Sequence, residues 1–209
     1  RMDSLMVAAN IRNLSLLELF YTCVSNLCKI MNERGTKIPD EQHHYIEKDD
    51  YNKCIYHKRD MDATERTIVV MKDADILIKI CDSTGDFDDT SEYQLLIRLL
   101  KERTIIDDDG SRRLRQKEEV ENPSEVLLNP SDPEATFRYK AGGKHLGYVG
   151  NIVESVGENG RLIIDYDYQQ NTYADNQFMK DYLKRKKDFS DGSFLVADGA
   201  YSGEKNSRL

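Results

Sequence analysis

The chain has 209 residues, 39% of them hydrophobic, and a formal net charge of −8 at pH 7. This length can bury a sizeable core in one domain or two. No apolar run approaches the roughly 20 residues needed to cross a bilayer, so we expect no membrane-spanning segment. The acidic balance argues against a protein that coats nucleic acid by its overall charge, although a local basic stripe remains compatible with phosphate binding.

Cysteine usage indicates the compartment. The cysteines lie in apolar, helix-like segments without paired short spacings, at Cys23, Cys28, Cys54 and Cys81. This pattern favours buried reduced thiols over zinc ligands or disulfides. Together with an N-terminal stretch that does not resemble a secretory signal, it predicts a cytoplasmic protein.

Helices are predicted throughout the first half of the sequence. From Ser15 onward, apolar residues recur at 3.6-residue spacing, Ser15 and Glu18 form a capping box, and Gly35 supplies a stop. This pattern predicts a helix of about five turns. Three more helical regions are expected, with start signals at Pro39, Asp62 and Thr90.

The second half of the sequence differs in composition. Residues 104–144 contain an Asp-Asp-Asp-Gly turn, a charged run and three of the four prolines, which predicts a connector with at most a small hairpin. Beyond it, residues 147–156 and 161–168 are predicted to be strands joined by a tight Asn-Gly turn. The next elements expected are a helix at 175–187, a strand at 194–197 and a helix that begins near Ser202.

Asp198 is the leading candidate for chemistry. It follows the expected strand at 194–197, and α/β folds carry their ligand sites at the carboxyl ends of strands. The plain alternative is that Asp198 caps the following helix. A divalent-cation site needs further carboxylates. The sequence offers Asp3, Asp132, Asp165 and Asp167.

Several motifs resemble the DDE-type insertion-sequence transposases. They are the run from Asn129 to Ala135 (NPSDPEA), the Gly147-Tyr148 pair in a strand, and the run from Ala197 to Tyr201 (ADGAY). The first ten residues, RMDSLMVAAN, are similar to the first-aspartate strand of that family. The resemblance implies that Asp3 and Asp198 are the first two catalytic, metal-binding carboxylates, and that Tyr201 packs or hydrogen-bonds beside them.

The same resemblance implies a fold. It is an α/β ribonuclease H-like mixed sheet with a large all-helical insertion between the first and second strands. Residues 1–10 would be the first strand, 11–103 the insertion, 104–144 the connector, and 145–209 an incomplete remainder of the core.

The implied activity is metal-dependent DNA cleavage and strand transfer, with two Mg²⁺ or Mn²⁺ ions and a homo-oligomer assembled on transposon ends and target DNA. The family's third carboxylate, a Glu on a later helix, has no place in a chain that stops eleven residues after Asp198. The sequence is therefore expected to be an inactive fragment of a longer transposase. Two alternatives stay open: a degenerate, non-catalytic DNA-binding or interaction module, and a metal-dependent nuclease that uses Asp132 in place of Asp3.

Basic residues form three clusters. Two of them, at residues 112–117 and 184–187, are typical of a solvated surface. The third cluster is the candidate contact with the DNA backbone, because Gly142 and Gly143 would let the chain approach a phosphate closely. Its members are Arg138, Lys140, Lys144 and His145.

Overall fold

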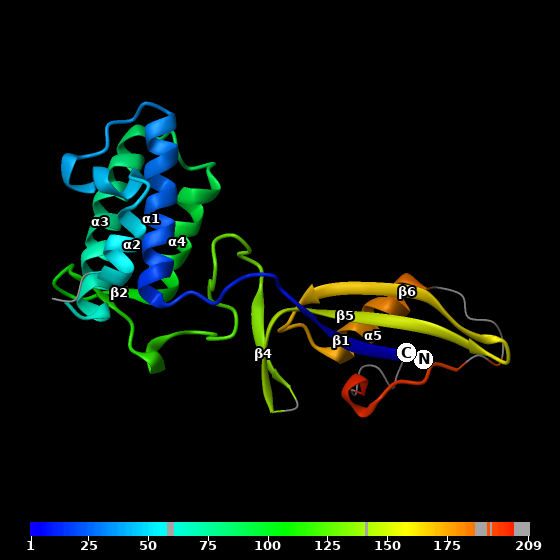
Figure 1. Ribbon diagram of the computed structural model, residues 1–209. Helices are drawn as coiled ribbons and strands as arrows, with labels where there is room; N and C mark the ends of the chain where they lie inside the picture. Colours follow the sequence, from blue (N-terminus) through cyan, green and yellow to red (C-terminus); the bar gives the residue numbers. More distant parts are fainter. Residues whose placement is uncertain (58–60, 141, 187–191, 193, 203–209) are drawn as a thin grey trace. The chain divides into compact units, whose positions relative to one another are not determined.

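The computed structural model describes residues 1–57, 61–140, 142–186, 192 and 194–202 (Figure 1). It is a mixed α/β protein with two compact units. The helical unit is Ile11–Pro133, and the sheet unit combines Arg1–Asn10 with Glu134–Leu209. The helical unit is therefore inserted after the first strand, as expected. Its boundary differs from the expected one, because residues 104–133 belong to this unit and are not a separate connector.

Three long helices build the helical unit. They are α1 (Leu16–Glu33), α3 (Ala63–Thr84) and α4 (Ser91–Arg103). Their starts follow the sequence signals, since Ser15 and Asp62 each complete a capping box and Thr90 accepts a hydrogen bond from the Tyr93 backbone. The four cysteines are buried and, in the part of the chain that the structure describes, form no disulfide, which confirms the predicted thiols. They contribute to the core formed by the three helices.

The segment after Pro39 is less regular than expected. In place of one helix it forms a 3₁₀ helix, η1 (Asp40–Ile46), a short α2 (Asp50–Asn52) and a π-helical turn, η2 (Lys53–His57). Side chains of neighbouring helices hold it: Ser25 Oγ donates to the Tyr45 carbonyl at 2.7 Å, and the Tyr45 hydroxyl donates to Asp73 at 2.7 Å. These tertiary bonds outweigh the helical periodicity of the segment.

A small hairpin follows α4. Strands β2 (Thr104–Ile106) and β3 (Arg112–Leu114) pair around the Asp-Gly turn, and η3 (Lys117–Glu119) comes next. The two arginines of β3 face acidic partners. Arg112 contacts Asp75 at 2.8 Å, and Arg113 pairs with Asp107 and Glu119.

The two ends of the helical unit are joined by a side chain. Asn129 Nδ2 donates to the carbonyl of Arg12 at 2.9 Å, and Asn129 Oδ1 accepts a hydrogen bond from the Ser131 backbone. Asn129, the first residue of the NPSDPEA motif, therefore links the C-terminal end of the helical unit to its N-terminal end.

Among its described residues, the sheet unit contains four antiparallel strands: β1 (Met2–Ala8), β4 (Thr136–Lys140), β5 (Gly143–Gly157) and β6 (Gly160–Gln170). Strand β5 lies between β1 and β6 (Figure 1), and its first residues pair with β4. The β5–β6 hairpin was predicted, with both strands slightly shorter. Strand β4 was not predicted, because it falls in the expected connector.

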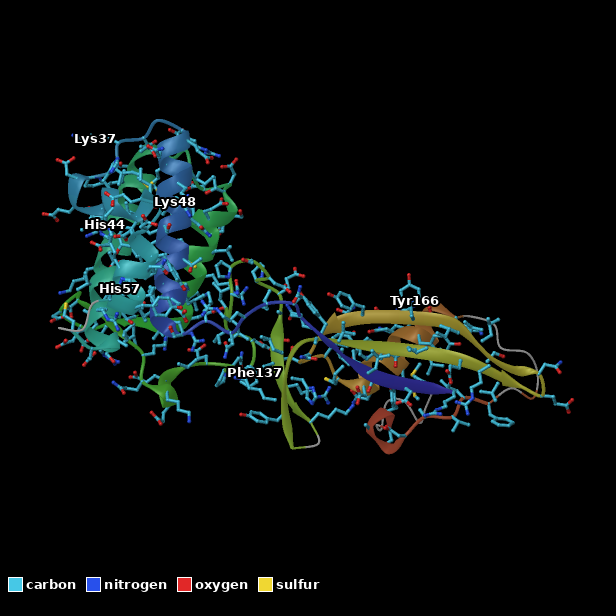
Figure 2. All side chains as sticks on the ribbon, viewed as in Figure 1. Lys37, His44, Lys48, His57, Phe137 and Tyr166 are labelled. Carbon is cyan, nitrogen blue, oxygen red and sulfur yellow. The ribbon has the colours of Figure 1, made fainter. Side chains whose placement is uncertain are left out.

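One face of this sheet carries the second core. Met2, Val149 and Val153 pack against α5 (Asp175–Arg185) through Phe178 and Tyr182. The other face is open among the described residues, with Tyr166 of β6 (Figure 2) 78% exposed. Helix α5 ends two residues before the predicted boundary, and Lys187 lies outside the described residues.

The C-terminal segment corrects one expectation. Residues 194–197 do not form a regular strand, but a backbone hydrogen bond from Met2 N to the Val196 carbonyl at 2.8 Å joins them to β1. A 3₁₀ turn, η4 (Gly199–Tyr201), follows Asp198, which is its N-cap. The helix expected to begin near Ser202 lies outside the described residues. Glu204 lies outside the described residues.

Candidate metal and DNA site

The structure brings the segments of Asp3 and Asp198 together. The hydrogen bond from Met2 N to the Val196 carbonyl joins the residue before Asp3 to a residue just before Asp198. Tyr201 lies within the electrostatic influence of both carboxylates. The pKa of Tyr201 is raised to about 12, first by burial and then by the charges of Asp175, Asp3 and Asp198, while a hydrogen bond with Ser4 opposes the increase. Two aspartates from opposite ends of the chain therefore share one region of the sheet unit.

Each of these carboxylates already has a partner. The guanidinium of Arg1 contacts Asp3 Oδ2 at 2.6 Å, and Asp3 Oδ1 accepts the Ser4 backbone N–H at 3.0 Å. Asp198 Oδ1 accepts the Ala200 N–H at 2.8 Å as the N-cap of η4. The alternative role of Asp198 as a cap is thus realised. Because Asp3 and Asp198 are both exposed, the cap does not hide the carboxylate from solvent.

These donors fit part of a site for a hard cation. Carboxylate oxygens are the ligands that Mg²⁺ and Mn²⁺ prefer, and two of them belong to neighbouring segments. Within the ranges that the structure describes, no group of three or more His, Cys, Asp or Glu residues is arranged to hold a metal ion. The structure therefore places Asp3 and Asp198 in neighbouring segments and arranges no complete set of metal ligands among the described residues.

The other candidate carboxylates are engaged elsewhere. Asp165 and Asp167 on β6 both contact Arg185 of α5, at 2.9 and 2.8 Å. Burial would raise the pKa of Asp167, but hydrogen bonds from Arg185, the Tyr168 backbone and Gln169, together with the charge of Arg185, outweigh it and the pKa is lowered. Asp132 belongs to the helical unit, where its backbone N–H donates to the Asn129 carbonyl at 3.2 Å.

The basic cluster lies on the β4–β5 hairpin, but its members do not share one face. Arg138 lies opposite His145 in the strand register, and Tyr139 lies opposite Lys144. Since cross-strand partners point to the same face and successive residues alternate, Arg138, Lys140 and His145 face one way and Lys144 the other. Lys144 Nζ lies 4.5 Å from the ring centroid of Phe137, which Figure 2 shows on β4.

Two of the four basic residues suit a phosphate contact better than the others. Lys140 is exposed, and its Nζ lies 3.4 Å from Ser4 Oγ, beside Asp3. Lys144 is also exposed. Arg138 faces the buried Asp175 at 3.9 Å, and its Nη1 atom is buried. This geometry gives Arg138 a structural role in joining the hairpin to α5.

Sequence reasoning missed one polar residue of this region. Asn151 occupies an inward-facing position of β5 between Val149 and Val153, and its Oδ1 accepts a hydrogen bond from the Tyr201 hydroxyl at 2.9 Å. A signal was present, because an amide at an inward position of an apolar strand needs a hydrogen-bond partner. The sequence alone does not identify that partner.

The comparisons with known proteins add no relative. No family model matches the chain, and no curated protein or solved structure matches it. Among the residues that the structure describes, no helix is both long and apolar enough to cross a membrane.

Proposed function

We propose that the sheet unit is part of a ribonuclease H-like catalytic core of a DDE-type DNA transposase, in which Asp3 and Asp198 bind divalent cations. The observation that carries this proposal is the Met2–Val196 backbone hydrogen bond, which puts the segments of the two aspartates side by side. The motifs that resemble such transposases indicate the same two residues, independently of this hydrogen bond.

The order of elements supports this fold. Strands β1, β5 and β6 are antiparallel neighbours, helix α5 covers one face, and the chain then returns to β1 at Val196. The fold that the motifs imply has three strands, a helix and a fourth strand that ends in the second aspartate. Residues 194–197, which precede Asp198, are joined to β1 by a backbone hydrogen bond but form no regular strand. The insertion of the helical unit directly after β1 agrees with that arrangement.

The chemistry would be phosphodiester cleavage and strand transfer. Metal ions held by Asp3 and Asp198 would lower the pKa of an attacking water or 3′-hydroxyl and stabilise the departing oxygen. Lys140 and Lys144 would contact the DNA backbone, which positions the substrate without reading its sequence. The contact between Lys140 and Ser4 supports this role, because it places an ammonium group next to the residue that follows Asp3.

Metal titration of three variants tests the proposal. Electron paramagnetic resonance of free Mn²⁺ should show binding by the unmodified chain, loss of binding in Asp3→Asn and Asp198→Asn, and unchanged binding in Asp132→Asn. Loss in Asp132→Asn with retention in Asp3→Asn would overturn the proposal in favour of the nuclease alternative. Retention in all three variants would overturn it in favour of a non-catalytic DNA-binding module.

A further inference from the structure

We propose that the hydrogen bond between Tyr201 and Asn151 positions Asp198 beside Asp3, so that Tyr201 is a positioning residue for the metal site. The inference rests on the proposed metal role of the two aspartates. The Tyr201 hydroxyl donates to Asn151 Oδ1 at 2.9 Å. Tyr201 is 1% exposed and Asn151 2%, so the contact lies inside the second core.

Tyr201 and Asp198 are the two ends of one tight turn. Asp198 is the N-cap of η4 and Tyr201 is its last residue, and Tyr201 N donates to the Asp198 carbonyl at 3.2 Å. The Asp198 side chain bonds to Ala200 N within the same turn. A displacement of the Tyr201 ring would therefore move the Asp198 carboxylate with it.

Asn151 is fixed to the strand that carries Asp3. In the β1–β5 register Asn151 lies directly opposite Ser4, and Asp3 lies opposite Ile152. The Tyr201–Asn151 bond thus connects the turn of Asp198 to the strand pair of Asp3. The Met2–Val196 backbone bond makes a second connection, but it involves neither side chain of the turn.

A polar pair at this place has a function that an apolar pair would lack. The neighbouring inward positions of β5 are Val149 and Val153, so packing alone would be satisfied by apolar side chains. A hydrogen bond adds direction, because it weakens steeply when donor and acceptor leave their preferred geometry. Burial raises the pKa of Tyr201 to about 12, so the hydroxyl keeps its proton and acts as a donor instead of a nucleophile.

The test compares two tyrosine hydroxyls of the sheet unit in the full 209-residue chain. Tyr201→Phe keeps the ring and removes the hydroxyl, and with it the bond to Asn151 and the hydrogen bond with Ser4. The matched control is Tyr173→Phe, which removes a hydroxyl that donates to Asp181. We expect Tyr201→Phe to weaken Mn²⁺ binding about tenfold, equivalent to ~1.4 kcal/mol, and the control to leave it unchanged. Urea unfolding of both variants measures the loss of stability separately from the loss of metal affinity.

A double-mutant cycle gives the second readout. Asn151→Ala should also weaken Mn²⁺ binding, and the double variant should lose less affinity than the sum of the two single losses, because both changes break the Tyr201–Asn151 bond. If Tyr201→Phe binds Mn²⁺ like the unmodified chain while Asp198→Asn does not, the positioning role is wrong and the proposed metal site stands. If the unmodified chain binds no Mn²⁺, both proposals are wrong.

Discussion

Gly147 lies so close to Val7 that a β-carbon on Gly147 would be 2.3 Å from the Val7 carbonyl oxygen. Its φ of +137° also lies in a region that residues with side chains rarely adopt. Gly147 pairs with Ala8 of β1 and with Thr136 of β4, at the point where three strands meet. The absence of a side chain is therefore a condition for β1 to pair with β5.

Gly147→Ala should destabilise the sheet unit by about 3 kcal/mol, because both the backbone conformation and the contact with Val7 are incompatible with a β-carbon. Gly160→Ala is the matched control, since Gly160 has a φ of +129° but nothing lies within 4 Å of its added β-carbon. Urea unfolding followed by circular dichroism measures both. Equal losses in the two variants would show that the approach of Val7 contributes nothing.

Acid should destabilise the helical unit through Glu18. Burial would raise the pKa of Glu18, but hydrogen bonds from Ser15, Tyr51 and Arg12 lower it to about 2. A carboxyl whose pKa is lower in the folded than in the unfolded state stabilises the protein above its unfolded pKa, roughly 4.3. That contribution, on the order of 2 to 3 kcal/mol, is lost as the pH falls from about 4 to 2.

Glu18→Gln tests this contribution. The variant should be less stable at pH 6, and its free energy of unfolding should change less between pH 5 and pH 3 than that of the unmodified chain. Glu33→Gln, at the exposed end of α1, serves as the control for the general effect of removing a carboxylate. An identical pH profile for Glu18→Gln and the unmodified chain would contradict the assignment.

The thiols should be unreactive in the folded protein. Burial raises the pKa of Cys23 and Cys28 to about 12, and that of Cys81 to about 11. Because the thiolate is the reactive form, a disulfide reagent at pH 8 should modify the native chain slowly and all four cysteines quickly in guanidinium chloride. Rapid reaction of any native thiol would show that the helical core opens readily.

Substitutions in the β4–β5 hairpin should distinguish residues that contact DNA from residues that stabilise the fold. Lys140→Gln and Lys144→Gln should each weaken duplex DNA binding and lower the salt dependence of the affinity by about one unit of slope, with little change in stability. Arg138→Gln should instead lower stability, because it leaves the buried Asp175 without its positive partner. Fluorescence anisotropy and thermal unfolding measure the two effects. A loss of DNA affinity confined to Arg138→Gln would reverse the assignment.

The local elements were largely predictable from the sequence. Periodicity and caps at Ser15, Asp62 and Thr90 located three helices, and the Asn-Gly turn located the β5–β6 hairpin. These signals act between neighbours in the chain, so they need no tertiary information. The segment at 40–57 did not follow its pattern, because bonds to α1 and α3 determine its shape.

The candidate site depends on contacts that no local pattern encodes. The nearness of Asp3 and Asp198 was expected from the resemblance to transposases alone, since periodicity says nothing about residues at opposite ends of the chain. Strand β4 was missed because its five residues are stabilised by hydrogen bonds with β5. The partner of Asn151 was missed because Tyr201 lies far from it in the sequence. The metal and DNA roles stay predictions.

The bond between Asn129 and Arg12 also bears on the order of folding. Strand β1 pairs with residues of β5 that are synthesised long after it, so the sheet unit must wait for distant sequence. The helical unit is continuous in sequence and can form first. Once it has formed, Asn129 and Arg12, 117 positions apart, are already held together. The folded helical unit has then already brought the two ends of this long loop together, so the entropy cost of closing the loop no longer opposes the pairing of β1 with β5. We expect the insertion to speed the completion of the sheet.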